Sequence, residues 1–281
     1  MSASKHRIIT PVSDFNETTA HYNEDPNFFR SFLDPYMKYT SGLYETPFDS
    51  LEDACVRMLD KIIASAAIEP GYSILEIGPG WGSLIKRLKQ RNIEINYTGV
   101  SPSAVQNAFI RDNISSNVDI KTSTFEVAIF PDASFDAIVM IGSFCHLKDK
   151  ISSLQKAAKM LKPNGRIIIE DTFFLSSDLY RKHCNHLQTK FVQQEIFGFA
   201  EVPALSSFLD DLIQADLRLS ETLEHGDSYR RTIADWQRRL RSLPLSDNRD
   251  RYLRYMDIFQ KGWDYTISNH LLVIRPALTR R

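Results

Sequence analysis

The amino-acid sequence predicts an α/β protein with a doubly wound parallel sheet, a helical N-terminal segment and an inserted helical cap. Three observations indicate this fold. Short apolar runs alternate with helical segments between residues 70 and 172. Helical segments stand on both sides of that region, and one more apolar run follows near the C-terminus. We therefore expect an N-terminal helical lid segment over 1–68, a ligand-binding core over 69–172, a helical cap over 173–265 and a strand over 266–281 that completes the sheet.

The N-terminal segment is crowded with aromatic residues before a predicted helix. The aromatic residues are Tyr22, Phe28, Phe29, Phe32, Tyr36, Tyr39 and Tyr44. Apolar residues recur at helical spacing from Glu52 to Ala67. An aromatic cluster of this kind usually forms core, and the alternative is that some of its rings line a substrate pocket.

The core segment contains four predicted strands separated by three predicted helices. Each strand is an apolar, β-branched run bounded by Gly, Pro, Asn or Asp. The strands are Ser73–Ile77, Ile95–Val100, Ala137–Ile141 and Arg166–Glu170, and the helices are Ser83–Gln90, Ser103–Asn113 and Ile151–Leu161. Pro163 is expected to stop the last helix, and Asn164-Gly165 is expected to turn into the last strand. Sheets of this kind bind ligands at the carboxyl ends of their strands.

The region after residue 172 is expected to be mostly helical, until His270–Arg275 returns to the sheet as a strand. Because this insertion lies between two strands of one sheet, it predicts a cap over the active site. Residues 216–254 mix arginines with acidic residues. The mixture favours a solvated, ion-paired surface. The alternative is a site for a phosphate, a carboxylate or an acyl carrier.

Composition excludes several classes of function. A net charge of -1 gives no field that would attract nucleic acid, and 43% hydrophobic residues suffice for a core. The three cysteines are far apart and none lies at metal-ligand spacing, so we expect no disulfide framework and no metal site. No apolar run suits a signal peptide or a membrane span, which predicts a cytoplasmic protein without stable membrane insertion. The sequence leaves open whether the protein forms a homo-oligomer.

A glycine-rich turn stands between the first predicted strand and the first helix of the core. It reads Glu76-Ile77-Gly78-Pro79-Gly80-Trp81-Gly82. Glycines here let the backbone approach a ligand closely and adopt positive φ. The Gly-x-Gly-x-Gly spacing differs from that of pyrophosphate-binding turns. Glu76 would repel a pyrophosphate, but it would tolerate a sulfonium and an amino group.

Two further sequence motifs support a ligand that carries a sulfonium and an amino group. One runs from Phe130 to Asp136 before the predicted strand Ala137–Ile141, and the other from Leu161 to Gly165 before the predicted strand Arg166–Glu170. Both occur in the order found in methyltransferases. Together with the glycine turn they predict a class I methyltransferase, Rossmann-like fold that binds S-adenosyl-L-methionine.

The N-terminal segment resembles one methyltransferase family more closely. The phrases are His21-Tyr22-Asn23, Phe28-Phe29, Phe32-Leu33-Asp34-Pro35 and Met37-Lys38-Tyr39-Thr40-Ser41-Gly42-Leu43-Tyr44. They resemble the opening of the cyclopropane-fatty-acid-synthase and mycolic-acid-methyltransferase family, which includes small-molecule C- and N-methyltransferases. A weaker likeness continues through Tyr229, Thr232, Trp236 and Tyr255 to the C-terminus.

The resemblance implies cofactor contacts for particular residues. Tyr39 and Thr40 match the pair that closes over the methionine moiety, and Gly78 and Gly80 match the loop beneath it. The other implied contacts are Ser101 and Gln106 near the second strand, Phe125 over the adenine and Ile141 behind it. For each of these residues the alternative role is plain packing.

Departures from the family bear on the chemistry. The resemblance implies that cyclopropane synthases hold a bicarbonate ion as general base, and three of its four ligand positions differ here. Pro79 stands where the family has Cys in the glycine loop. Cys145 stands where the family has Glu after its fourth strand, and Glu170 stands where it has His at the end of its fifth. Tyr255 is kept. Lipid cyclopropanation therefore becomes doubtful.

Glu170, His146 and Tyr255 are the candidate catalytic residues. A buried carboxylate at Glu170 could accept the proton released by methylation, or stabilise a cation. Alternatively, Glu170 caps the next helix or pairs with an arginine of the cap. His146 follows the predicted strand Ala137–Ile141 and is a second candidate base, although a lone histidine there is often structural.

The function predicted from the sequence is an S-adenosylmethionine-dependent methyltransferase. We expect it to act on a small molecule, of secondary metabolism, at carbon or at an amine nitrogen. The alternative enzyme is a lipid-modifying cyclopropane synthase. A third possibility is a non-catalytic protein that uses this fold for binding. Methylation of nucleic acid is disfavoured, since there is no basic domain.

Overall fold

The computed structural model describes residues 21–116, 118–263 and 265–277. Within them one seven-stranded sheet has the order β3-β2-β1-β4-β5-β7-β6. Its strands are β1 (Ser73–Ile77), β2 (Asn96–Ser101), β3 (Asp119–Thr122), β4 (Phe135–Ile141), β5 (Leu161–Phe174), β6 (Leu217–Glu224) and β7 (Ile267–Pro276). Strands β1 to β5 pair in parallel, whereas β7 runs antiparallel to both β5 and β6. The predicted doubly wound fold is therefore confirmed.

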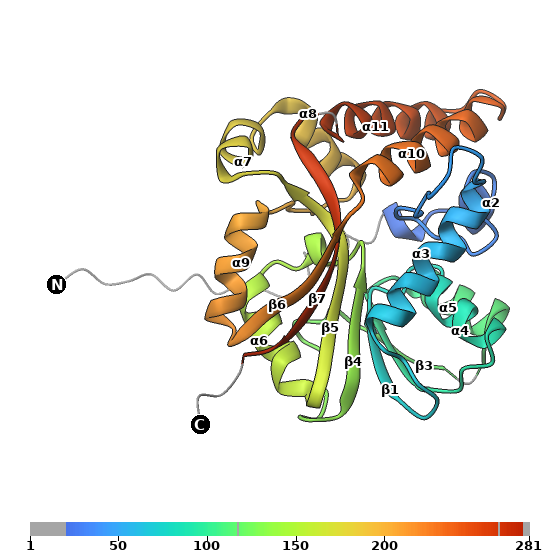
Figure 1. The fold of residues 1–281 in the computed structure, drawn as a ribbon. Coiled ribbons are helices and arrows are strands. Elements are labelled where there is room, and N and C mark those ends of the chain that lie inside the picture. Colours follow the sequence, from blue (N-terminus) through green and yellow to red (C-terminus); the bar gives the residue numbers. More distant parts are fainter. Residues whose placement is uncertain (1–20, 117, 264, 278–281) are drawn as a thin grey trace.

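Helices cover both faces of this sheet (Figure 1). One face carries α3 (Leu51–Ser65), α4 (Ser83–Gln90) and α5 (Ala104–Asn113), and the other carries α6 (Lys150–Met160) and α9 (Leu205–Gln214). Neighbouring strand residues point to opposite faces. Ile138 accordingly packs with α6, and Val139 packs with α3. Because both faces are buried, these strands are continuous apolar runs, as the sequence indicated.

Side-chain caps fix where several helices begin. Ser50 and Asp53 form a reciprocal capping box at the start of α3. Ser103 caps α5, and Asp149 caps α6. Helix α4 instead begins after Gly82, whose φ of 80° lies in the left-handed region. These short-range signals explain why the helix boundaries of the core were predictable.

The cap lies over one end of the sheet (Figure 1). It contains α7 (Ser177–His183), α8 (Leu187–Lys190), the π-helical η3 (Phe191–Ile196), α10 (Gly226–Arg241) and α11 (Asp247–Trp263). The N-terminal η1 (His21–Asn23) and α2 (Pro26–Arg30) lie against it. Phe29, Phe32, Trp236 and Tyr252 share one buried aromatic cluster. Most of the N-terminal aromatics are therefore core of the lid.

Two strands were not predicted, and β4, β5 and β7 are longer than predicted. β3 buries only Ile120, so its sequence lacks an apolar run. β6 is an edge strand with exposed polar residues inside the segment expected to be helical. β5 begins at Leu161, directly after α6, and Pro163 therefore does not end the helix. Asn164, with a φ of 69°, falls in a register shift of β5.

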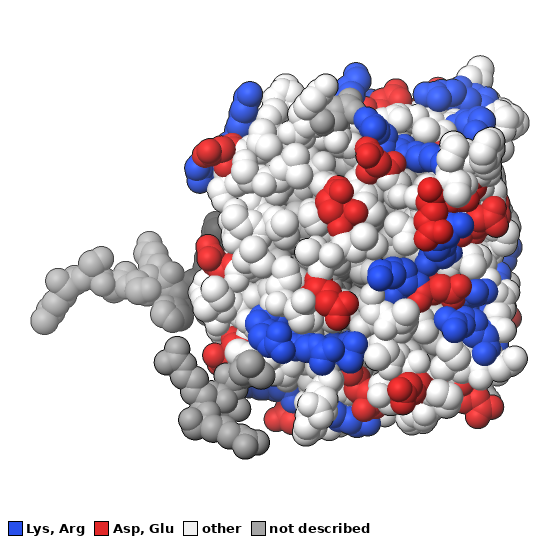
Figure 2. Space-filling view, in the orientation of Figure 1, with Lys and Arg blue, Asp and Glu red and all other residues white. Residues whose placement is uncertain are grey.

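Charged side chains of both signs are interspersed over the face shown in Figure 2. The arginine-rich helix α10 follows this pattern, because Arg238 pairs with Asp235 at 2.6 Å and Arg239 pairs with Glu52 at 2.5 Å. An ion-paired surface is thus confirmed for these residues. Among the described residues, no helix is long and apolar enough to cross a membrane.

Candidate active site

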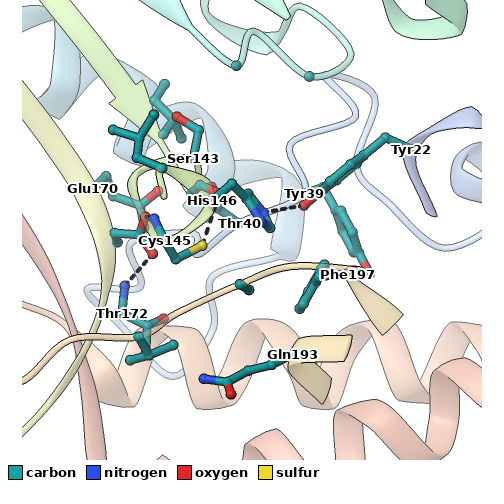
Figure 3. A pocket seen from close by; sticks show the side chains of 18 of the residues that line it. Tyr22, Tyr39, Thr40, Ser143, Cys145, His146, Glu170, Thr172, Gln193 and Phe197 are labelled. Carbon is teal, nitrogen blue, oxygen red and sulfur yellow. Dashed lines mark hydrogen bonds between the residues drawn. The ribbon is translucent and has the colours of Figure 1, made fainter. Parts of the chain in front are cut away.

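A cavity of about 940 Å³ lies where the carboxyl ends of β1, β4 and β5 meet the cap and the N-terminal segment. Every site residue predicted from the sequence lines it. These are Tyr39, Thr40, Glu76, Gly78, Gly80, Ser101, Gln106, Phe125, Ile141, His146, Glu170 and Tyr255. The close-up in Figure 3 shows part of this set around one end of the cavity. The roles expected for the individual residues stay predictions.

The glycine turn has the backbone that its sequence predicted. Gly78 and Gly80 have φ values of 73° and 54°, which L side chains rarely adopt. A Cβ at Gly78 would lie 2.6 Å from Ser143 Cβ, so the turn packs tightly against the segment after β4. Nothing lies within 4 Å of a Cβ position at Gly80. Gly80 therefore exposes its backbone to a ligand in the cavity.

Glu76 is buried at the end of β1, where the Tyr97 hydroxyl donates a 2.6 Å hydrogen bond to Oε2. Burial raises the pKa of Glu76 to about 7, and the Tyr97 hydrogen bond opposes this rise. On β2, Ser101 is buried and its Oγ accepts from the Ser103 amide at 3.2 Å. Carboxyl, hydroxyl and backbone groups thus line the half of the cavity nearest the glycine turn.

Phe125 and Ile141 border the same half of the cavity from different elements. Phe125 precedes β4 in a loop, is buried, and carries Lys156 Nζ 4.7 Å from its ring centre. Ile141 is the last residue of β4. Both side chains line the cavity, and their expected contacts with adenine stay predictions.

Residues 37–42, which we call the strap, cross the carboxyl ends of β4 and β5. A Cβ at Gly142 would overlap Thr40 Cγ2, so the strap lies directly on the turn after β4. Tyr39 faces the cavity, and its buried hydroxyl makes no well-aligned hydrogen bond among the described residues, although it lies near the Tyr255 phenol. A buried hydroxyl without a partner is costly, which suits a residue that contacts a bound ligand.

The carboxylate of Glu170 is fully buried beneath the strap and belongs to a polar network. Lys38 Nζ lies 3.4 Å from Oε2, and Asn269 Nδ2 donates to Oε1. The Lys38 ammonium also donates to Thr40 Oγ1 and, at 2.7 Å, to the Ser41 carbonyl. Glu170 therefore pairs with a lysine of the N-terminal segment, not with an arginine of the cap.

His146, in η2 (Phe144–His146), makes hydrogen bonds through both ring nitrogens. Nδ1 lies 2.7 Å from the Phe199 carbonyl, and Nε2 lies 2.7 Å from the Tyr22 hydroxyl (Figure 3). Because a carbonyl only accepts, Nδ1 must carry the proton, and Nε2 accepts from Tyr22. Burial lowers the pKa of His146 to about 4. The ring is therefore neutral at pH 7, with its basic nitrogen pointed at Tyr22.

Aromatic rings close the cap side of the cavity. Tyr255 on α11 is buried, and burial raises the pKa of its phenol. Its ring packs edge-on against the ring of Phe197, with 5.4 Å between the ring centroids. The cap aromatics Phe197, Tyr229, Tyr255 and Phe259 line the cavity. Phe208 lies instead in the core below the sheet.

Three residues of the site were not predicted as functional: Tyr22, Lys38 and Asp171. Tyr22 and Lys38 stand in the N-terminal phrases that carried the resemblance, but nothing in the sequence indicates that they meet His146 and Glu170. Asp171 directly follows Glu170 at the end of a buried strand. A second carboxylate at the end of a sheet strand is a signal that could have identified it.

A family model described as mycolic acid cyclopropane synthetase matches residues 10–261 of the chain. The chain belongs to this family. Its relatives include the cyclopropane mycolic acid synthase MmaA2 of Mycobacterium tuberculosis, 25% identical over 266 residues, which cover 88% of this chain and 91% of the relative. The resemblance predicted from the N-terminal segment is thus confirmed.

Solved structures show the same fold. The structure of MmaA2 from Mycobacterium tuberculosis matches with a TM-score of 0.83 and 24% identity, over 95% of this chain and 99% of that one. Coclaurine N-methyltransferase bound to N-methylheliamine and SAH matches with a TM-score of 0.79 and 18% identity, over 96% and 84% of the two chains.

Family membership and the glycine turn together identify this family member as a transferase that depends on S-adenosylmethionine. The residues present fit that cofactor. The backbone at Gly80 is open to the cavity, and the Tyr39 hydroxyl and the Glu76 carboxyl group both border it.

Proposed function

We propose that this enzyme transfers a methyl group to a small-molecule acceptor, at an amine nitrogen or at carbon, and that His146 receives the acceptor's proton through Tyr22. The bound cofactor supplies an electrophilic methyl group on its sulfonium. The observation that carries this proposal is the hydrogen-bonded chain from the Phe199 carbonyl through His146 to Tyr22, with Tyr22 and His146 lining the cavity.

Tyr22 and His146 together move the acceptor's proton in two coupled steps. The Tyr22 oxygen keeps lone pairs that can accept a proton from the substrate, while its own proton passes to His146 Nε2. The Phe199 carbonyl holds Nδ1–H in place and stabilises the imidazolium that forms. Burial raises the pKa of Tyr22, with smaller contributions from Cys145, Tyr255, Tyr252 and Asp171. The phenol therefore stays protonated until His146 takes its proton.

We assign proton acceptance to His146 in preference to Glu170. A proton on the Glu170 carboxylate would break its ion pair with Lys38. The loss would leave a buried ammonium without a counter-charge, which is strongly unfavourable. Glu170 is better suited to hold the strap, and with it Tyr39 and Thr40, over the cofactor. The role of Tyr255 in catalysis stays a prediction, as do a cytoplasmic location, secondary metabolism and a homo-oligomeric state.

The proposal is tested by calorimetry and by a panel of acceptors. We expect S-adenosylmethionine to bind, and S-adenosylhomocysteine to form when the enzyme meets small amines or activated carbon acids. The product is followed by mass spectrometry. Absence of turnover with every small molecule, together with methylene addition to unsaturated phospholipid vesicles, would instead establish the second candidate. That candidate is a lipid-modifying cyclopropane synthase.

One observation favours the second candidate: the relatives that match 88% of this chain are named cyclopropane mycolic acid synthases. The bicarbonate positions argue against it, because Cys145 and Glu170 replace two ligands that the resemblance implies. Turnover that depends on added bicarbonate would favour cyclopropanation. Turnover indifferent to bicarbonate is expected for the methyltransferase.

The affinity for S-adenosylmethionine should depend on pH through Glu76. Since burial raises the pKa of this acid to about 7, its carboxylate forms as the pH rises through 7 and is lost below it. Binding of a sulfonium and an ammonium favours the carboxylate. We therefore expect the dissociation constant to rise about tenfold from pH 8 to pH 6. Glu76→Gln should remove this dependence in calorimetry, and an unchanged pH profile in that variant would contradict the assignment.

A further inference from the structure

Two neighbouring carboxylates on β5 have different environments. Glu170 is bonded to Lys38 and Asn269. Asp171 points to the opposite face of the sheet, as alternate strand residues do. Its oxygens accept hydrogen bonds from two backbone amides, those of Cys145 at 3.0 Å and Thr172 at 2.8 Å. Both carboxylates border the cavity, but only Glu170 has a cationic side chain bonded to it.

The charge of Asp171 is not balanced by a bonded cation in the described part of the chain. Lys150 acts on it electrostatically, but the Lys150 ammonium donates to the Leu147 carbonyl at 3.0 Å and pairs with Glu201 at 3.2 Å. Asp171 is 5% exposed, and burial raises its pKa to about 6. At pH 7 and above Asp171 is therefore a buried carboxylate. Burying an unpaired charge costs free energy, and a positively charged ligand would reduce that cost.

Tyr22 is linked to Asp171 through two adjacent residues, because the Cys145 amide donates to Asp171 at 3.0 Å and the next residue, His146, accepts from the Tyr22 hydroxyl at 2.7 Å. Burial, and to a lesser extent the charge of Asp171, raises the pKa of both Tyr22 and Tyr229. Tyr22, Tyr229 and Tyr255 line the same cavity as Asp171. The faces of aromatic rings attract cations, most strongly where water is excluded. A carboxylate and several rings together form a site for a cationic nitrogen, whereas an alkene would gain nothing from the carboxylate before it reacts.

We propose that the acceptor is an amine, and that Asp171 is the counter-charge for its nitrogen. This inference rests on the proposed methyl transfer and names its substrate class. The nitrogen lone pair forms a bond to the methyl carbon of S-adenosylmethionine as the carbon–sulfur bond breaks. The electrons of that bond return to sulfur, which leaves as a neutral thioether, and the positive charge passes to nitrogen. A primary or secondary amine then loses its proton to the Tyr22–His146 chain, while a tertiary amine keeps the charge.

The experiment measures binding and needs no turnover. Benzyltrimethylammonium and its neutral isostere neopentylbenzene are titrated into the enzyme loaded with S-adenosylhomocysteine, at pH 7.5. We expect the cation to bind the unmodified enzyme at least about tenfold more tightly than the neutral probe. Asp171→Asn should remove this preference while affinity for S-adenosylhomocysteine stays within about threefold. Asp178→Asn, which removes an exposed carboxylate outside the cavity, serves as the control.

Equal binding of the two probes, binding of neither, or a preference that survives in Asp171→Asn would overturn the inference. Even if Asp171→Asn fails to fold, equal binding of the two probes by the unmodified enzyme still overturns the inference. Failure here is distinguishable from failure of the proposed function. A methyltransferase for carbon would still turn over acceptors while showing no preference for the cationic probe.

Discussion

Replacing His146 with asparagine is expected to lower turnover by about 10²–10⁴-fold, while affinity for S-adenosylmethionine changes little. The asparagine amide can still donate to the Phe199 carbonyl, but it offers Tyr22 no basic nitrogen. Tyr22→Phe should have a similar effect, because it removes the group between the acceptor and His146. Both variants are assayed by formation of S-adenosylhomocysteine with the acceptor found in the panel, and cofactor affinity is measured by calorimetry.

A matched control is Tyr252→Phe. This change removes another buried hydroxyl, one on helix α11 of the cap that lies 3.1 Å from His21 Nδ1 and outside the cavity. Its turnover should remain close to that of the unmodified enzyme. Two results would refute the proton chain: turnover of Tyr22→Phe or His146→Asn within threefold of normal, or losses in the double variant equal to the product of the single losses. Residues that act as a unit are not additive.

Removing one partner of the Lys38–Glu170 pair should destabilise the enzyme by about 3–5 kcal/mol. Both side chains are buried, so either Lys38→Met or Glu170→Gln leaves a polar group in the interior with its partner missing. The double variant should be more stable than either single variant, because it leaves no unpaired charge. Urea unfolding at pH 7.5, with the slope compared among variants, gives these free energies.

The same variants separate two roles for Glu170. If Glu170 holds the strap, Glu170→Gln weakens cofactor binding, because Thr40 and the Ser41 carbonyl lose the ammonium position that anchors them. A general base would behave differently: stability and cofactor affinity would stay normal and turnover alone would disappear. Arg181→Met, which breaks an exposed ion pair with Asp178, is the control and should change stability by less than about 1 kcal/mol.

The core of the fold was predictable because its signals are local. β1 and α4 fall on the predicted residues, since an apolar run, a glycine turn and an amphipathic helix each show within a few residues. β3 and β6 escaped because short or edge strands bury few side chains and leave no apolar run. Strand β6 is stabilised by pairing with β7, a contact that involves residues about fifty positions away.

The cofactor half of the site was also predictable. Glu76, Gly78 and Gly80 stand in one continuous turn, and positive φ at the glycines follows from the absence of a Cβ. Ser101 and Ile141 end β2 and β4, and Phe125 lies in the loop between β3 and β4, so the order of the strands fixes where they must lie. The resemblance supplied the rest of this half, because the N-terminal phrases are specific to the family.

The sequence by itself thus determined the core of the sheet, the cofactor and the family of this protein. Only the tertiary structure decided which charged and polar groups meet in the cavity. Tyr22 bonds to His146 across 124 positions, and Lys38 pairs with Glu170 across 132. No local rule of propensity or spacing links residues so far apart. Their pairing depends on how the strap and cap fold back over the strand ends. The sequence could therefore name Glu170 as a candidate base or cation stabiliser, but it could not show the ion pair with Lys38.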